Sequence, residues 1–390
     1  MSSTTLNVVS SKPRLVAEVA PFRLGYRPAF DGLRGLAILS VLAFHTHHLF
    51  GWSLLRGGLV GVDVFFVLSG FLITTLLLEE WDRFGAIGLK SFYWRRVLRL
   101  VPALLLLLAT LYYLSDVLLS PSDAHATKRA IPIAFVYASD LALAFFRIHV
   151  GALQHTWSLA MEEHFYIVWP IVLLLALKMN IGRKRLILLT LCLAAVSSLY
   201  RATLQQFGAS PVRTYYGIDT RADALLIGCA TGMSVSWGLI RAQTFRLWLG
   251  PALVFIAVCL VAIDYSTPFM HAGGFTLLAL ATAVLLLNLV LAPASYARTL
   301  LESSPIVWLG RISYGVYLWH YPVFKATSLL NAGWPLKLCV AFAVTLLVST
   351  ISYYLFERPV LAFKRKFAST DPRKSAANIR SRVLASEQLS

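Results

Sequence analysis

Histidine and arginine side chains stand inside long apolar stretches of this sequence, where ionisable groups are costly and therefore usually functional. His45 lies eleven residues after Arg34 in one such stretch. In a helix this spacing puts both side chains on one face, about 16 Å apart along the axis. Histidine is the side chain best suited to general-base catalysis near neutral pH. The pattern therefore predicts a catalytic His45 with Arg34 near the membrane rim, while a histidine that only packs against a neighbouring helix would fit it too.

A carboxylate, Asp63, follows in the small-residue-rich stretch 57–71. Small residues let helices approach closely, but they do not account for the carboxylate, so we expect Asp63 to orient a histidine or to pair with an arginine. Ser69 lacks the preceding glycine of a nucleophile elbow. His45 and His48 can share a helix face, but no third ligand has suitable spacing, so no metal site is predicted.

Arg96 and Arg99 are three residues apart at the start of another apolar stretch, so both can project from one helix face. Planar guanidinium groups bind phosphate oxygens through paired hydrogen bonds. The pair therefore fits a phosphate or pyrophosphate. The competing interpretation is that it only anchors a helix at the cytoplasmic surface.

Two more clusters combine aromatic and ionisable residues. Glu162 and Glu163 begin an apolar stretch, where one carboxylate can stabilise a helix amino terminus while the other faces the bundle. Tyr317 and His320 lie in an aromatic-rich stretch that fits a groove for a sugar or polyketide, although aromatic rings also pack in any bundle. Together with Trp157, they are predicted to bind substrate.

The elements that would position these residues are transmembrane helices. The chain has 390 residues, and 58% of them are hydrophobic, more than a soluble domain of this size could bury. About 20 apolar residues are needed to cross the hydrocarbon core. Ten stretches qualify: Arg34–Phe50, Leu59–Leu78, Val97–Leu119, Glu163–Leu177, Leu186–Tyr200, Ala222–Ile240, Leu247–Ile263, Gly273–Leu291, Ile306–Leu329 and Leu336–Phe356. We therefore predict an all-α fold, a polytopic integral membrane bundle of about ten helices.

An eleventh stretch, Ile131–Ile148, contains Asp140 and Pro132. Ten spans place most Lys and Arg on one side, as expected for cytoplasmic loops, whereas eleven would put the basic tail outside. We therefore expect this stretch to lie at the outer interface or to re-enter between helices. Both termini are then cytoplasmic, with a cytoplasmic arm over 1–29, a transmembrane domain over 30–360 and a basic, disordered tail over 361–390.

The distribution of charged residues indicates which classes of partner the protein can bind. The formal net charge is +17, but the basic residues fall in short clusters between apolar runs. Such clusters suit anionic lipid headgroups better than a nucleic-acid surface. No nucleic-acid partner is expected.

Taken together and in order, the motifs resemble the acyltransferase 3 family of membrane-bound acyltransferases, from Phe30-Asp31-Gly32-Leu33-Arg34-Gly35 to Phe356-Glu357-Arg358-Pro359. The resemblance implies transfer of an acyl group, usually acetyl from acetyl-coenzyme A, to a hydroxyl of a carbohydrate, glycolipid or macrolide in the bacterial inner membrane. Many members carry an extracytoplasmic hydrolase-like domain that this sequence does not contain. We therefore expect transfer to finish within the membrane domain or to pass to a partner.

The resemblance also implies roles for individual residues. His45 and Arg34 would be the central functional pair, and Glu162 would be the carboxylate of the Trp-Ser-Leu motif. Arg96 and Arg99 would hold the coenzyme A phosphates. His164 departs from the glutamine common in the family, a change expected to bear on the acceptor side.

The mechanism that follows has His45 deprotonating the acceptor hydroxyl, with Asp63 or Glu162 orienting the imidazole and Arg34 offsetting negative charge. A covalent acyl-His45 relay fits the sequence equally well. The competing functions are a transporter, whose usual inverted repeats are not apparent in the sequence, and a non-catalytic scaffold, which the ionisable residues argue against.

Overall fold

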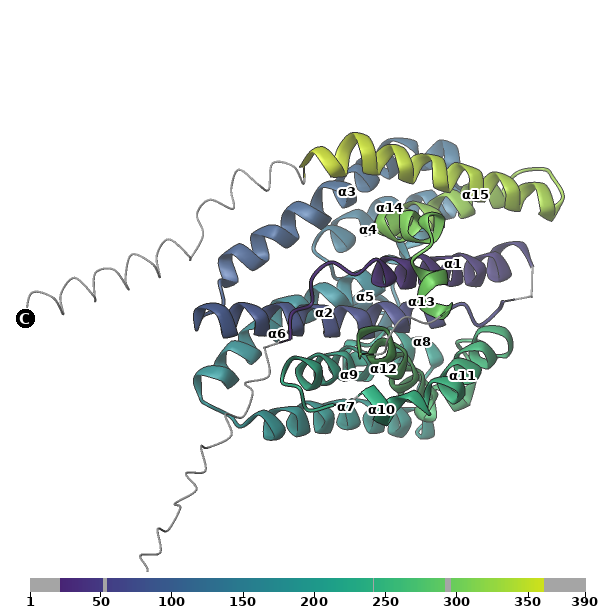
Figure 1. The fold of residues 1–390 in the computed structure, drawn as a ribbon. Coiled ribbons are helices and arrows are strands. Elements are labelled where there is room, and N and C mark those ends of the chain that lie inside the picture. Colours follow the sequence, from purple (N-terminus) through teal and green to yellow (C-terminus); the bar gives the residue numbers. More distant parts are fainter. Residues whose placement is uncertain (1–21, 52–54, 241, 292–295, 361–390) are drawn as a thin grey trace, which may run out of the picture.

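The structure is a computed structural model that describes residues 22–51, 55–240, 242–291 and 296–360, and every regular element in these ranges is helical (Figure 1). The longer helices are α1 (Pro28–Phe50), α2 (Val60–Phe84), α3 (Leu89–Leu118), α4 (Pro121–Phe135), α6 (Thr156–Lys178), α7 (Arg183–Gln206), α9 (Ile218–Ser236), α11 (Leu249–Ala262), α12 (Phe275–Leu291), α14 (Ser304–Ser328) and α15 (Trp334–Ile351). The shorter ones are α5 (Ser139–Ala144), α8 (Pro211–Tyr216), α10 (Ala242–Arg246), α13 (Tyr296–Leu301), a 3₁₀ turn (Gly151–Leu153) and two π-helical turns (Met270–Gly274 and Ser352–Glu357). The all-α prediction is confirmed for this part of the chain.

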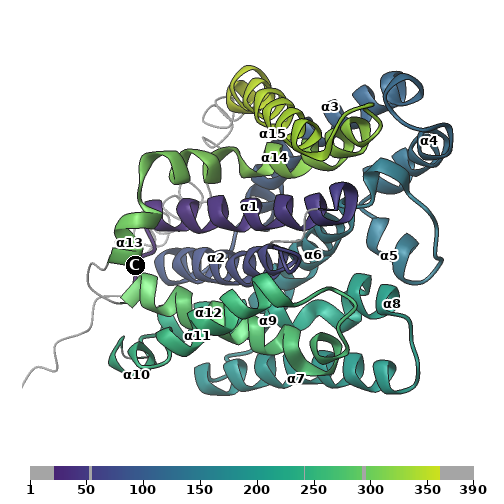
Figure 2. The same cartoon turned by 90° about the vertical axis from the view of Figure 1, so that its right-hand side faces the viewer.

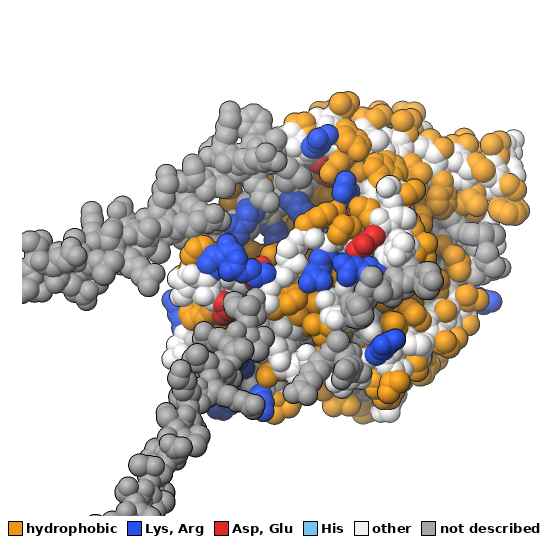
Figure 3. Space-filling model, in the orientation of Figure 1, with side chains coloured by type: hydrophobic (Ala, Val, Ile, Leu, Met, Phe, Trp, Pro, Cys, Tyr) orange, Lys and Arg blue, Asp and Glu red, His pale blue; other side chains and the backbone are white. Residues whose placement is uncertain are grey.

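Apolar helices form much of the outside of the bundle. Within the described ranges, seven helical segments are long and apolar enough to cross a membrane: Val60–Phe84, Leu89–Leu118, Thr156–Lys178, Arg183–Gln206, Thr244–Ala262, Met270–Leu291 and Trp334–Val360. In the most apolar 18-residue part of Thr244–Ala262, only 11% of the residues are buried inside the structure. Figure 3 shows hydrophobic side chains over much of one face, with Lys and Arg gathered toward one end. Lipid must therefore cover surface that the protein leaves open.

Three predicted spans correspond to helices outside this set, namely α1, α9 and α14. About half or more of the residues in each are buried, and α1 lies between α2 and α14 (Figure 2). These three helices thus occupy the interior of the bundle. The total of ten spans and the side of each terminus stay predictions.

Glycines bring the interior helices into close contact. A Cβ atom on Gly70 of α2 would lie 2.0 Å from the carbonyl oxygen of Leu225 in α9. One on Gly310 of α14 would lie 1.7 Å from the carbonyl oxygen of Asp31 in α1. Neither position has room for a larger residue, so the backbones of these pairs pack directly on each other.

The stretch Ile131–Ile148 does not form one helix. It is split between α4 and α5, with Tyr137 in the left-handed region at φ 55° between them. Neither helix, at 15 and 6 residues, is long enough for the hydrocarbon core. Its buried Asp140 lies 3.2 Å from Nδ1 of His164 in α6, so both residues have an identified partner.

Helix α6 begins earlier than predicted, at Thr156 rather than Glu163. The polar residues Thr156, Ser158 and Glu162 in this earlier part of the helix all have hydrogen-bond partners in the bundle interior. The predicted tail over 361–390 and most of the arm over 1–29 lie outside the described residues.

Candidate active site

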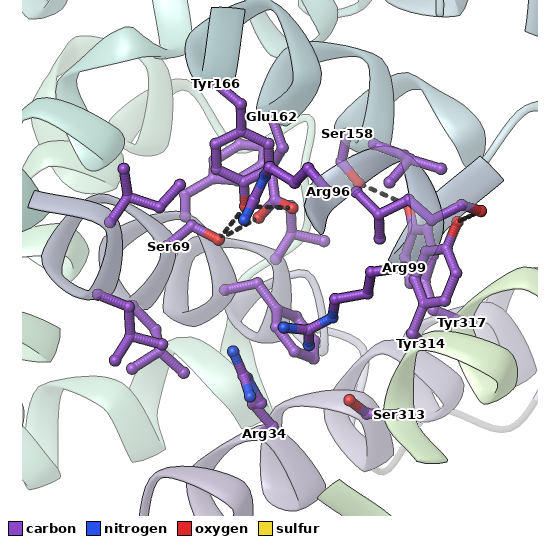
Figure 4. Close-up of a pocket in the computed structure, with 18 of the residues that line it drawn as sticks. Arg34, Ser69, Arg96, Arg99, Ser158, Glu162, Tyr166, Ser313, Tyr314 and Tyr317 are labelled. Atoms are coloured by element: carbon purple, nitrogen blue, oxygen red, sulfur yellow. Dashed lines mark hydrogen bonds between the residues drawn. The ribbon is translucent and has the colours of Figure 1, made fainter. Parts of the chain in front are cut away.

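Three arginines from two helices surround one cavity of about 160 Å³, here called the arginine cavity (Figure 4). Arg34 comes from α1, and Arg96 and Arg99 come from α3. Its other walls are formed by Val62, Phe65, Phe66, Leu68, Ser69, Leu72, Ile73, Leu76, Leu100, Ser158, Leu159, Glu162, Tyr166, Ser313, Tyr314 and Tyr317. The predicted phosphate-binding pair therefore faces a cavity, and Arg34 joins it there.

A hydrogen-bonded group forms one wall of this cavity. Ser69 Oγ donates to Glu162 Oε1 at 2.8 Å, and Tyr166 Oη donates to Glu162 Oε2 at 3.1 Å. The guanidinium carbon of Arg96 lies 3.1 Å from the centre of the Tyr166 ring, an attractive cation–π arrangement. Arg96 Nε is buried without a hydrogen-bond partner in the described structure. Arg96 is thus held in place by the Tyr166 ring.

A second cavity, of about 220 Å³, contains His45 and is called the histidine cavity. Most of its wall is aromatic or polar, and its lining residues are Val41, Phe44, His45, His48, Leu49, Leu59, Val62, Gln154, His155, Trp157, Tyr215, Tyr216, Tyr265, Tyr317 and Tyr321. Aromatic faces with scattered hydrogen-bonding groups suit a neutral polar ligand better than an anion.

The two cavities adjoin, because Val62 and Tyr317 line both of them. Tyr317 Oη donates to the backbone carbonyl of His155 and lies 2.6 Å from Ser158 Oγ. Its ring is therefore fixed between the cavities. A molecule reaching from one into the other would pass Tyr317 and Val62.

The His45 ring contacts two groups on one of its sides. Its Nδ1 lies 2.9 Å from the carbonyl oxygen of Val41 and 3.2 Å from Nε2 of His320. His320 is fully buried and lines neither cavity. The structure therefore places His320 behind His45 rather than on a substrate surface, whereas the other two predicted substrate residues, Trp157 and Tyr317, do line the histidine cavity.

The structure separates several residues that the sequence-based mechanism grouped around His45. Arg34 and Glu162 line the arginine cavity, not the histidine cavity. Asp63 Oδ1 accepts a hydrogen bond of 2.7 Å from Arg221 Nη2, and both side chains are fully buried. Of the two partners predicted for Asp63, the structure gives it the arginine. Neither carboxylate forms a hydrogen bond with His45 in the described structure.

One network of hydrogen bonds in the histidine cavity was not predicted from the sequence. Tyr321 Oη donates to Gln154 Oε1 at 3.1 Å, and Gln154 Nε2 donates to Tyr216 Oη at 3.0 Å. Burial raises the pKa of the Tyr216 phenol to about 12, so it stays neutral and keeps its proton for donation. These residues come from three distant segments, which no local pattern links.

The sequence predicted no metal site, and the histidines considered for one lie at the end of α1. His48 Nε2 lies 3.7 Å from Asp264 Oδ2, while His45 turns toward Val41 and His320. Within the described ranges, no group of three or more His, Cys, Asp or Glu side chains is arranged to hold a metal ion.

Comparison with known proteins finds one family and several relatives. The sequence profile of a family described as an acyltransferase domain matches residues 27–354. The chain is 34% identical over 356 residues to YrhL of Bacillus subtilis (strain 168), named as a putative peptidoglycan O-acetyltransferase. It is 33% identical over 354 residues to the peptidoglycan O-acetyltransferase OatA of Listeria monocytogenes.

These alignments cover 86% of this chain but only 55% of YrhL and 56% of OatA. The chain therefore spans little more than half the length of these relatives. No solved structure gives a significant match.

Replacing Asp63 by Ala should lower stability rather than act only on a chemical step. The change leaves the buried Arg221 without its carboxylate, which typically costs about 3–5 kcal/mol. The thermal unfolding midpoint of purified protein in detergent measures the effect. Asp116→Ala is the matched control, because it removes a carboxylate from the exposed Lys128 pair, where the cost is about 1 kcal/mol or less. An Asp63→Ala protein with unchanged stability and no activity would instead support the catalytic role.

Proposed function

Because the chain belongs to the acyltransferase domain family, which covers residues 27–354, we propose that it is a membrane-bound O-acyltransferase. It moves an acyl group, with acetyl as the first candidate, from acyl-coenzyme A to a hydroxyl of a carbohydrate acceptor at the bacterial inner membrane. One observation carries this proposal: a cavity ringed by arginines adjoins a cavity that contains His45. The first suits a phosphate-bearing donor, and the second suits a neutral, hydroxyl-bearing acceptor.

The arginine cavity has positive charge available for a donor. Arg34 lies 3.5 Å from Asp31, but none of its three arginines forms an ion pair with Glu162 in the described structure. Guanidinium groups that converge in this way bind phosphate oxygens through strong, charge-assisted hydrogen bonds. Coenzyme A presents a diphosphate at the base of its pantetheine arm, which supports it as the donor.

The spacing of Arg34 and His45 along α1 matches the length of that arm. Arg34 and His45 belong to one straight element, α1, and eleven residues of helix span about 16 Å. Roughly fourteen bonds separate the diphosphate from the thioester carbonyl, and an extended chain advances about 1.1–1.2 Å per bond, which gives about 16 Å. A donor with its diphosphate among the arginines would therefore bring its acyl carbonyl close to His45.

The proposed chemistry uses Nε2 of His45, which has no hydrogen-bond partner in the described structure and belongs to a residue of the cavity wall. Nε2 takes the proton of the acceptor hydroxyl as the oxygen bonds to the thioester carbonyl carbon. The carbon–sulfur bond then breaks, and the leaving thiolate takes the proton back from His45. The products are the ester and free coenzyme A. An acyl-His45 intermediate would use the same lone pair in two successive displacements.

The histidine cavity supports a carbohydrate acceptor. Trp157, Tyr215 and Tyr216 form a contiguous aromatic surface, with ring centres 4.8–5.2 Å apart. Sugars offer apolar faces to such rings and hydroxyls to groups such as Gln154 and Tyr216. The names of OatA and YrhL favour a peptidoglycan sugar over a glycolipid or macrolide.

Coenzyme A release from acetyl-coenzyme A by protein in nanodiscs tests the function. We expect release that depends on a carbohydrate acceptor, with peptidoglycan fragments in the panel, and that falls to background in His45→Ala. His47→Ala is the control, because His47 is the neighbouring histidine on α1 but lines neither cavity. A folded His45→Ala protein with full activity would rule out the proposed chemistry. Absence of release with every acceptor would favour a transporter.

Arg99→Ala should raise the KM for acetyl-coenzyme A roughly 10- to 100-fold, because one charged hydrogen bond contributes about 1.5–3 kcal/mol. Arg95→Ala is the matched control: Arg95 lies on the same helix but outside the cavity wall, 3.9 Å from Glu80. Initial rates over a range of donor concentrations measure both variants. Equal KM values for Arg95→Ala and Arg99→Ala would contradict donor binding at the arginine cavity.

A further inference from the structure

The protonation of His320 follows from its backbone contacts. Its Nδ1 lies 2.6 Å from the carbonyl oxygen of Tyr317 and 3.2 Å from that of Val316. A carbonyl oxygen only accepts hydrogen bonds, so Nδ1 must carry a proton. His320 is also fully buried, and its ring lies among those of His155, Tyr317 and Phe324. A charged imidazole is costly there, so His320 is neutral and its Nε2 has a free lone pair.

The protonation of His45 follows from that of His320. His45 Nδ1 faces the Nε2 lone pair of His320 at 3.2 Å and the carbonyl oxygen of Val41 at 2.9 Å. Both partners are acceptors, so His45 carries its proton on Nδ1. In a neutral imidazole the other nitrogen is then unprotonated. Nε2, the atom that the proposed chemistry requires as a base or nucleophile, is therefore ready to react.

We propose that His320 is a positioning residue that acts through His45. Together with the carbonyl oxygen of Val41, it accepts the Nδ1 proton of His45, holds the ring orientation and tautomer, and leaves Nε2 free for the histidine cavity. This inference rests on the proposed function of His45. The orienting group is then a neutral imidazole and not the carboxylate of Asp63 or Glu162, neither of which bonds to His45.

His320 also has an effect during the reaction. When His45 takes the acceptor proton at Nε2, it becomes a cation, and hydrogen bonds donated by a cation are roughly twice as strong as neutral ones. The bond from His45 Nδ1 to His320 Nε2 therefore strengthens as charge develops. Loss of this bond should lower kcat more than it changes the KM for the donor, which binds at the other cavity.

A matched pair of variants isolates the acceptor at position 320. His320→Gln can place an amide oxygen near the original Nε2, whereas His320→Met has a similar length but only a weak acceptor. We expect kcat in His320→Met to be about 10- to 100-fold lower than in His320→Gln, with the KM for acetyl-coenzyme A the same in both. Equal kcat values in two folded variants would overturn the proposal.

A spectroscopic measurement tests the same inference without any turnover. Imidazole nitrogen shifts of protein labelled with ¹⁵N-histidine, assigned through His45→Gln, show which nitrogen of His45 is protonated. We expect Nδ1 protonation in the wild type and in His320→Gln. In His320→Met we expect a smaller fraction protonated on Nδ1, because only the carbonyl oxygen of Val41 then accepts that proton. Protonation of Nε2 in the wild type, or an unchanged tautomer in His320→Met, would overturn the role of His320. The expected spectra from a protein that transfers no acyl group would refute the proposed function alone.

Discussion

A charged side chain between apolar helices must find a partner, and this constraint separates the structural residues of the bundle from those of the site. Asp63 pairs with Arg221, and Asp223 pairs with Arg201 at 2.9 Å, all four fully buried. These pairs join α2, α7 and α9. The arginines of the arginine cavity are different: Arg34 lies 3.5 Å from Asp31, but within the described residues Arg96 and Arg99 form no ion pair and line an open cavity. We propose that an anionic ligand completes that cavity.

The polar interior depends on the helices that enclose it. Close contact at Gly70 and Gly310 holds α2 against α9 and α14 against α1. Helix α1 then contributes Arg34 to one cavity and His45 to the other, so one rigid element sets the distance from phosphate binding to chemistry. Helices α7, α11 and α15 contribute no residue to the wall of either cavity, and their exposed apolar side chains are available to lipid.

The sequence predicted which residues line the candidate site better than it predicted how they are grouped. His45, Arg96 and Arg99 were identifiable because ionisable groups inside apolar stretches are rare and costly. Their partners were not, because Asp63 meets a residue 158 positions away and His45 meets one 275 positions away. Helix periodicity fixes which face a residue occupies but not which helix covers that face. The aromatic wall residues Tyr215 and Tyr265 lie in segments that carry no motif, so only the packed structure identifies them.

In the proposed arrangement, a donor held at the arginines delivers its acyl carbon to His45. Bromoacetyl-coenzyme A tests it directly, because its reactive carbon occupies the acyl position and alkylates a nucleophile beside it. Peptide mass spectrometry then identifies the labelled residue. We predict alkylation of His45, slowed by added coenzyme A. A label on Ser69 or another residue of the arginine cavity, with none on His45, would contradict the arrangement proposed for the two cavities.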